Sequence, residues 1–569
     1  MVAETLLSDM SLCTPSSALS SGPKRGRWRL IDYEAEGLKG KMLWANSKTA
    51  APEVTLAPGV PGWHEVYLGI WDWAWSKVPV MITESAAEGG NLLKIRLSGE
   101  KAFTTIAKEY SDFKVEEVYW KSADLTGQSF VMGQQSEGIS RRASLAYIRL
   151  VPLSGERMAD TQREAARLDT KRLVAFNDGW SWIYENHPNT REDIDSQIVR
   201  YPGSDFGKVF YEAGYAAPQG LSVYDIDDFP RVGEEYANDS IRRFKAAGID
   251  PFEEALRFGH SIGLEVFGSL RLGMPKTAPP FDIGPQDGGA FFLNNIAFQC
   301  VDRDGSTFPS VSYAFPEVRS HVVKAFEKPI VLGADGITAL FHRGPPFVLY
   351  EQPLVDGFMA KGGEDPRKLP ENDERWLRFR AGAMTDFMRE LRKSAVEVSA
   401  RVGREVPKVA CVVFPTRDEN LRYGVDVESF VKEGLVDYVF ARDVLYATWE
   451  DKKADVPFFT GLTRGTKCKF FVMLGSAASS YRALGSSGDI GNAYATRAGE
   501  LYRQGVDGLS FWDTNFQDKY TATWSVLRRL GHADELKAGV FKPRKVRSIT
   551  LKKVGGIDVS FKHDAWYYV

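Results

Sequence analysis

The stretch IDPFEEALRFGHSIGLEVFGSLR (residues 249–271) contains a helix followed at once by a buried strand. Asp250 is a typical N-cap, Pro251 suits the first helical turn, and Glu253 stands where it would close a capping box. Gly263 stops the helix, and an apolar run follows it directly. A helix that leads straight into an apolar strand is the repeating unit of a parallel α/β sheet.

The same alternation recurs along the chain. Further apolar runs are RLVAFND (172–178), ADGITALFHRG (334–344), VPKVACVVFP (406–415), LVDYVFARD (435–443), CKFFVMLG (468–475) and VDGLSFWDT (506–514). Continuous apolar runs are typical of a parallel sheet that is buried on both faces. A less clear strand near AFQCVD (297–302) brings the number to eight, which predicts a closed (β/α)8 barrel of the TIM type.

An open, doubly wound sheet is the structural alternative. It is disfavoured because no glycine-rich phosphate loop follows the first strand, where FNDGWSW stands instead. An amphipathic helix over residues 376–398 fits either architecture.

Before the barrel the pattern differs. Residues 25–157 contain short runs rich in Val, Ile, Tyr, Phe and Trp with a turn about every ten positions, which predicts an all-β sandwich. Residues 1–24 have the composition of a disordered leader. The barrel is expected over residues 168–545, and residues 546–569 are expected to form a C-terminal β-hairpin that packs on the sandwich or the barrel.

Composition narrows the class of ligand. The net charge of the 569 residues is -3, which favours neither a nucleic acid nor a membrane surface as a partner. The four cysteines are far apart, so no disulfide framework, metal site or cofactor is expected. The first residues lack the pattern of a signal peptide, which predicts a soluble, cytoplasmic protein unless a leader was removed or replaced. The sequence does not decide whether the protein forms a homo-oligomer.

Aromatic residues make up 12% of the chain, including 14 Trp. Sugar-binding clefts use such rings because the C–H faces of a pyranose lie flat on them. A large sandwich and barrel would also bury many aromatics, so the composition alone does not decide between the two.

In a (β/α)8 barrel the carboxyl ends of the strands converge on one open face, so polar residues directly after a strand are the first candidates for a site. The residues that this rule selects for substrate binding are Asn177, Trp180, Trp182, Arg271, His342, Arg343, Arg417, Asp418, Arg442, Asp443 and Trp512. The arginines suit hydroxyl or carboxylate groups of a substrate, or else they neutralise nearby acids.

Glycosidic cleavage needs two carboxyl groups, and three candidates stand out. Glu351 is the expected general acid, because the apolar residues before it would raise the pKa of its carboxyl. Asp513 and Asp178 are the expected nucleophile or base. Each has a structural alternative: an ion pair with an arginine for Glu351, a helix N-cap for Asp513, and a turn for Asp178. For Asp418 and Asp443 the adjacent arginine makes an ion pair the simpler account.

Several motifs carry a resemblance: PGWHEVYLGIWD (61–72) in the sandwich, and ADGITALFHRGPPFVLYE (334–351), YGVDVESFVKEGLVDYV (423–439) and VDGLSFWDT (506–514) in the barrel. The chain resembles bacterial glycoside-hydrolase-like barrel proteins that loosely resemble family 10 glycosyl hydrolases, over most of residues 60–515. The resemblance implies a barrel with a carbohydrate ligand. It assigns no catalytic residue, since this chain lacks the Asn-Glu pair after a fourth strand that marks the largest clan of barrel glycosidases.

We therefore expect a glycoside hydrolase that cleaves an oligo- or polysaccharide by a two-carboxylate mechanism. One alternative is a carbohydrate-binding protein without catalysis. Another is a polysaccharide lyase acting on uronic acids, for which the arginines would neutralise the substrate carboxylate before proton abstraction.

Overall fold

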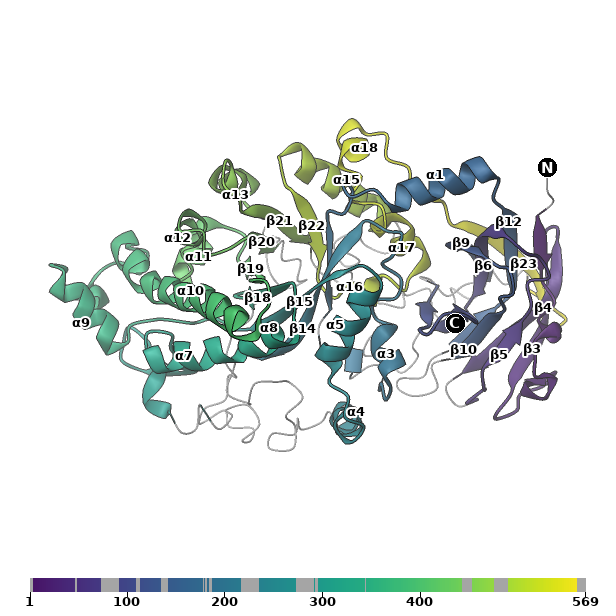
Figure 1. Ribbon diagram of the computed structural model, residues 1–569, viewed down its shortest axis with the longest axis horizontal. Coiled ribbons are helices and arrows are strands. Elements are labelled where there is room, and N and C mark those ends of the chain that lie inside the picture. Colours follow the sequence, from purple (N-terminus) through teal and green to yellow (C-terminus); the bar gives the residue numbers. More distant parts are fainter. Residues whose placement is uncertain are drawn as a thin grey trace.

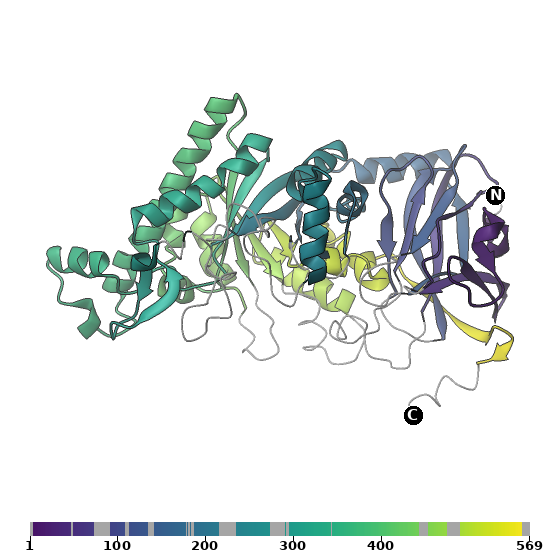
Figure 2. The same cartoon turned by 90° about the horizontal axis from the view of Figure 1, so that it is seen from below.

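The computed structural model describes residues 4–46, 49–72, 92–108, 113–134, 142–177, 179, 182–183, 187–215, 235–272, 291, 295–342, 344–442, 453–474 and 490–559. Within these ranges the molecule is elongated, with an antiparallel β domain at one end and an α/β domain beside it (Figure 1). The two lie side by side in the perpendicular view as well (Figure 2).

Eight parallel strands of the described chain close into a barrel, as the sequence predicts. In order around the barrel they are β13 (Leu173–Asn177), β14 (Phe206–Tyr215), β15 (Glu265–Arg271), β18 (Gly336–Leu340), β19 (Lys408–Val413), β20 (Tyr438–Arg442), β21 (Lys469–Leu474) and β22 (Gly508–Phe511). The barrel closes where β22 pairs with β13, with Ala175 opposite Phe511. The fold class is thus a (β/α)8 barrel preceded by an all-β domain.

One strand of the barrel differs from the prediction. The eighth strand is β14, whereas the run near AFQCVD forms β16 (Gln299–Val301), which pairs antiparallel with β17 (Thr307–Val311) in a separate two-stranded sheet. Lys208 and Glu212 interrupt the apolar pattern of β14, so it does not read as a buried strand. The predicted number of barrel strands was right, but the run near AFQCVD was wrongly assigned to the barrel in place of β14.

Helices lie along the chain between the strands of the barrel and after its last strand (Figure 1). They are α3 (Arg191–Asp195), α4 (Glu235–Ala246), α5 (Pro251–Ser261), α7 (Pro316–Ala325), α8 (Glu327–Leu332), α9 (Gln352–Ala360), α10 (Glu374–Val402), α11 (Arg417–Arg422), α12 (Val427–Lys432), α13 (Val456–Thr463), α15 (Ile490–Arg503), α16 (Thr514–Gln517), α17 (Thr521–Leu527) and α18 (Ala533–Ala538). The predicted cap of α5 is confirmed: the carboxylate of Asp250 accepts a hydrogen bond from the Glu253 amide at 3.0 Å.

Aromatic rings and glycines fill the interior of the barrel. Phe267 on β15 is the cross-strand partner of Gly336 on β18, and Phe471 on β21 is the partner of Gly508 on β22. In both pairs a methyl group in place of the glycine hydrogen would overlap the phenylalanine ring. The barrel is therefore a packed core with room for function only at its ends.

The β domain is a sandwich of two sheets. The larger, ten-stranded among described residues, contains β1 (Thr5–Leu7), β2 (Leu19–Ser20), β3 (Trp28–Ala35), β4 (Leu38–Asn46), β6 (Trp63–Trp71), β9 (Lys114–Asp124), β11 (Arg142–Leu145), β12 (Tyr147–Pro152), β23 (Arg547–Val554) and β24 (Ile557–Asp558). The smaller contains β5 (Val54–Leu56), β7 (Leu93–Leu97), β8 (Thr104–Ile106) and β10 (Phe130–Gln134). Side chains from both sheets, such as Leu68 and Ile95, share one apolar core.

Both ends of the chain take part in this sandwich. The expectation of a disordered leader is wrong for residues 4–24, because β1 pairs with β12 while Met10 and Cys13 are buried in the core. A few apolar side chains anchor the segment although its average composition is polar. At the other end, β23 lies between β9 and β3, so the chain returns to the sandwich after completing the barrel. The helix α1 (Gly155–Ala165) leads from sandwich to barrel.

Candidate functional site

Glu212 lies on the inner wall of the barrel, near the carboxyl end of β14. It shares that face with Phe210, which packs against Phe267 and Phe440 inside the barrel. Its side chain is 0% exposed, and its Oε1 atom lies 2.5 Å from the Nε atom of Arg271 on the neighbouring strand β15. The barrel thus holds a buried ion pair at the end where active sites of this fold occur.

A second group of side chains surrounds Trp512, which directly follows β22. Its ring stacks on Phe176 from β13, with centroids 4.1 Å apart. The guanidinium of Arg442 lies 4.7 Å from the Trp512 ring centroid, and the His342 ring meets it edge-on at 4.8 Å. Because Trp512 is buried, it positions Arg442 and His342 instead of offering an open face to a sugar.

Asp513 comes next and has an unusual backbone conformation. Its φ and ψ are 52° and 50°, in the left-handed region that residues other than glycine rarely occupy, although Asp tolerates it better than most. It occupies the N-cap position of α16, yet its side chain makes no capping hydrogen bond. Asp513 therefore stands at the start of α16 without capping the helix through its side chain.

The register of the sheet relates these two groups. β13 pairs with β14 on one side and with β22 on the other. Glu212 on β14 and Asp513, two residues after β22, therefore belong to strands that are two steps apart. Adjacent strands are about 4.8 Å apart, which places the two backbones about 10 Å from each other at the same end of the barrel. Two carboxylates, two arginines and one histidine therefore border the carboxyl-terminal mouth.

Below the mouth the inner wall is polar. Ser269, Thr338 and Ser510 are fully buried on three different strands. Within the described part of the chain their hydroxyl groups have no hydrogen-bond partner. Buried hydroxyls are costly without a partner, so this layer is suited to ordered water beneath a polar ligand.

Two residues predicted to bind substrate are packed inside the protein. Trp182 belongs to the main apolar core and leans on Phe244 of α4. Asn177 ends β13 with its side chain fully buried, where the Tyr201 hydroxyl lies 3.5 Å from its Oδ1 atom. Asn177 ends β13 and Trp182 follows it, close to where the sequence placed them, but their burial was not predicted.

Arg417 and Asp418 begin α11. Arg417 bonds Glu374 of α10 at 2.5 Å and lies 3.4 Å from Asp418, whose side chain is 92% exposed. This is the adjacent ion pair that the sequence suggested as the simpler account. Substrate binding by either residue stays a prediction.

Glu351 is held away from the barrel strands. Its carboxylate accepts hydrogen bonds from the amides of Leu349 and Val301, and the side chain is fully buried. Burial raises the pKa of this carboxyl, as the sequence predicted, although the backbone hydrogen bonds oppose the rise. Glu351 is the N-cap of α9, which lies at the end of the molecule while α16 lies near the middle (Figure 1). The structure therefore does not bring Glu351 to Asp513.

Four further predicted residues, Asp178, Trp180, Arg343 and Asp443, lie outside the described residues. Conversely, the sequence analysis missed Glu212. The signal that could have found it is the alternation in FGKVFYEAGY (206–215), where Phe210 and Glu212 fall on one face of a strand.

The described residues contain no group of three or more His, Cys, Asp or Glu side chains arranged to hold a metal ion. None of their helices combines the length and hydropathy needed to cross a membrane.

Comparison with known proteins gives fold-level neighbours only. No family model matches the chain, and no curated protein matches it. Among solved structures, the PgaB (BpsB) glycoside hydrolase domain from Bordetella bronchiseptica is 14% identical, with a TM-score of 0.40 over 63% of this chain and 98% of that one. A chitinase from Chromobacterium violaceum is 13% identical, with a TM-score of 0.33 over 64% and 99%.

A third neighbour is the Ostrinia furnacalis Group IV chitinase in complex with allosamidin. It is 11% identical, with a TM-score of 0.36 over 65% of this chain and 100% of that one. These findings do not support the resemblance to family 10 in particular.

Proposed function

We propose that the chain acts on a carbohydrate at the carboxyl-terminal mouth of its barrel, as a glycoside hydrolase with Glu212 and Asp513 as its carboxylate pair. The observation that carries this proposal is that the two strands flanking β13 bring a carboxylate each to one end of the barrel, Glu212 on β14 and Asp513 two residues after β22. A glycosidic bond between them would have one carboxyl group on each side, which is what acid and nucleophile or base require.

The surroundings suggest different roles for the two groups. Arg271 at 2.5 Å from Glu212 matches an ionised carboxylate, which suits Glu212 as nucleophile or base. Asp513 is partly exposed at the rim, where it would act as the acid. Arg442 and His342, fixed by Trp512, would hold substrate hydroxyls.

The test is release of reducing sugar from a panel of oligo- and polysaccharides by the full chain and its variants. Glu212→Gln and Asp513→Asn keep size and polarity, and each should lower the rate about 100-fold or more. Matched controls are Glu397→Gln on α10 and Asp239→Asn on α4, both exposed ion-pair residues on outer helices, which should leave the rate unchanged. Unchanged rates in both variants would rule out Glu212 and Asp513 as the catalytic carboxylates.

Further arms of the same experiment separate the alternatives. Glu351→Gln tests the residue that the sequence favoured: a loss confined to that variant, with an intact fold, would move the chemistry to Glu351. Ultraviolet absorbance from an unsaturated product would indicate a lyase. Saturable binding by calorimetry without any product would indicate a carbohydrate-binding protein.

A further inference from the structure

A cavity of about 850 Å³ lies between the sandwich and the barrel. Its walls come from β9 of the sandwich, from α1, from residues 199–205 before β14, and from α17 with the residues after it. None of the residues that border the barrel mouth lines it. Asp160 on its rim is 58% exposed, so the cavity is reachable from solvent.

Arginines dominate the inner part of this cavity. The guanidinium groups of Arg544 and Arg528 lie 3.9 Å and 5.0 Å from the centroid of the same ring, that of Tyr119. Arg528 and Arg200 likewise share the ring of Trp524, at 5.9 Å and 5.3 Å. Three positive charges thus converge around two aromatic rings on the two sides of the domain boundary.

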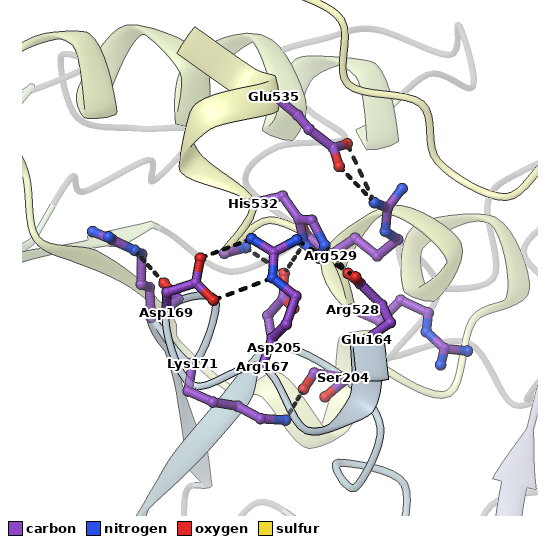
Figure 3. Close-up of polar contacts among 12 residues, drawn as sticks. Glu164, Arg167, Asp169, Lys171, Ser204, Asp205, Arg528, Arg529, His532 and Glu535 are labelled. Carbon is purple, nitrogen blue, oxygen red and sulfur yellow. Dashed lines mark hydrogen bonds and ion pairs between the residues drawn. The ribbon is translucent and has the colours of Figure 1, made fainter. Parts of the chain in front are cut away.

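The carboxylates of the cavity are already engaged. Asp205 accepts hydrogen bonds from the Gly531 amide at 2.8 Å and from His532 at 2.7 Å, and Glu164 bonds the other ring nitrogen of His532. Figure 3 shows this arrangement, with Glu164 and Asp205 on two sides of His532 and with Arg529 directed to Glu535. Each of these acids therefore has a partner of its own.

Arg528, in contrast to these acids, has no ion-pair partner among the described residues. Its one side-chain hydrogen bond to a described residue runs from Nη2 to the Gly203 carbonyl at 3.1 Å. Burial lowers the pKa of Arg528. Tyr119 and the charge of Asp205 oppose this shift, and the charges of Arg544 and Arg200 add to it. A guanidinium has five N–H donors in a planar fork, so most of its capacity is unused. Arg544 and Arg200 have carboxylate partners, Glu65 at 2.9 Å and Asp518 at 3.5 Å. An anion placed here would therefore balance chiefly the charge of Arg528.

We propose that the cavity binds a small ligand bearing a carboxylate or phosphate group, with that group held by Arg528 and Arg544. A bare ion would leave most of the volume empty, so the body of the ligand is about the size of a sugar or larger. Polar side chains of the wall such as Thr104 and Ser122 face this body. This inference depends on the arginines between the domains. It is independent of the function proposed for the barrel mouth.

Calorimetric titration of the full chain tests the proposal, with galacturonate, glucose 6-phosphate, inorganic phosphate and neutral glucose as probes. We expect at least one acidic sugar to bind and glucose not to bind, with an affinity that falls as salt is added. Arg528→Gln should weaken binding about 10-fold or more, and Arg528→Lys, which keeps the charge but not the fork, should weaken it less. Arg389→Gln, an exposed ion-pair arginine on α10, should bind like the unchanged chain.

Three results would overturn the proposal. One is equal affinity of Arg528→Gln and the unchanged chain for every acidic probe. Another is binding of glucose as tight as that of glucose 6-phosphate. The third is inorganic phosphate binding as tightly as the sugar phosphate, because the cavity would then contribute nothing to the body of the ligand. Arg528→Lys keeps the experiment decisive if the glutamine variant does not fold.

Discussion

Asp195 on α3 and Glu254 on α5 are two carboxyl groups that the structure buries together beside Arg257. Burial, and then the charge of Glu254, raise the pKa of Asp195 from its ordinary value of 3.8 to about 7. Burial also acts to raise the pKa of Glu254, but hydrogen bonds from Arg257 and Arg191 outweigh it and the net direction is down. Asp195 therefore carries the proton of the pair near neutral pH.

This pair predicts a pH dependence of stability. A carboxyl with a raised pKa in the folded state contributes stability that is complete below its unfolded value and is lost as the pH rises through about 7. Asp195→Asn cannot ionise, so its melting temperature should fall less than that of the unchanged chain between about pH 5 and about pH 9. Thermal melts over this range, with the exposed Asp239→Asn as control, provide the measurement. Parallel melting curves for all three proteins would contradict the prediction.

At the same scale, the sequence identified some site residues and missed others for physical reasons. Arg271 and Arg442 end their strands and Trp512 and Asp513 come directly after theirs, close to where the sequence placed them, because those strands are largely apolar. Glu212 was missed because a charged residue inside a strand resembles a loop until its ion pair with Arg271 is known. That pair joins side chains 59 positions apart, which local pattern cannot reveal.

Among the elements, β18 carries a glycine whose hydrogen faces the ring of Phe267 on β15. Gly336→Ala would push a methyl group into that ring, and overpacking of a core typically costs about 1–3 kcal/mol. Urea denaturation should show this loss in the free energy of unfolding.

The matched control is Gly382→Ala in α10, where a methyl group would meet nothing within 4 Å. Alanine in place of glycine inside a helix should raise stability by about 0.5–1 kcal/mol. Both substitutions replace glycine by alanine. Equal changes in the free energy of unfolding would therefore show that the contact with Phe267 does not determine the loss of stability.

Elements were predictable where one local signal sufficed. The cap of α5 depends on Asp250 and its end on Gly263, each a local signal beside the helix, and both are present. β14 and β16 could not be ranked, because both are short runs of mixed polarity and only pairing with β13 and β15 distinguishes a barrel strand. β1 was mistaken for part of a disordered leader because its anchor, the pairing with β12, lies more than 140 positions away.

For the whole molecule, the position of β23 means that the sandwich is not complete without a strand that follows the barrel in the chain. β23 pairs with both β9 and β3 in the middle of the larger sheet, and its Leu551 is fully buried. The domains also exchange hydrogen bonds directly: the Ala107 amide donates to the Lys519 carbonyl at 2.8 Å, and the Thr521 hydroxyl donates to Glu116 at 2.6 Å.

Sandwich and barrel should therefore unfold in one transition. Leu551→Ala removes a buried side chain at a typical cost of about 2–5 kcal/mol, and that loss should lower the melting temperature of the whole chain. Scanning calorimetry should show a single peak that moves, whereas Ile557→Ala, at an exposed position of the same hairpin, should leave it in place. A split into two peaks, of which only one responds to Leu551→Ala, would mean that the strand returning to the sandwich does not couple the domains. In that case the domain that melts first would remove one wall of the inter-domain cavity, so anion binding should be lost at the first of the two transitions.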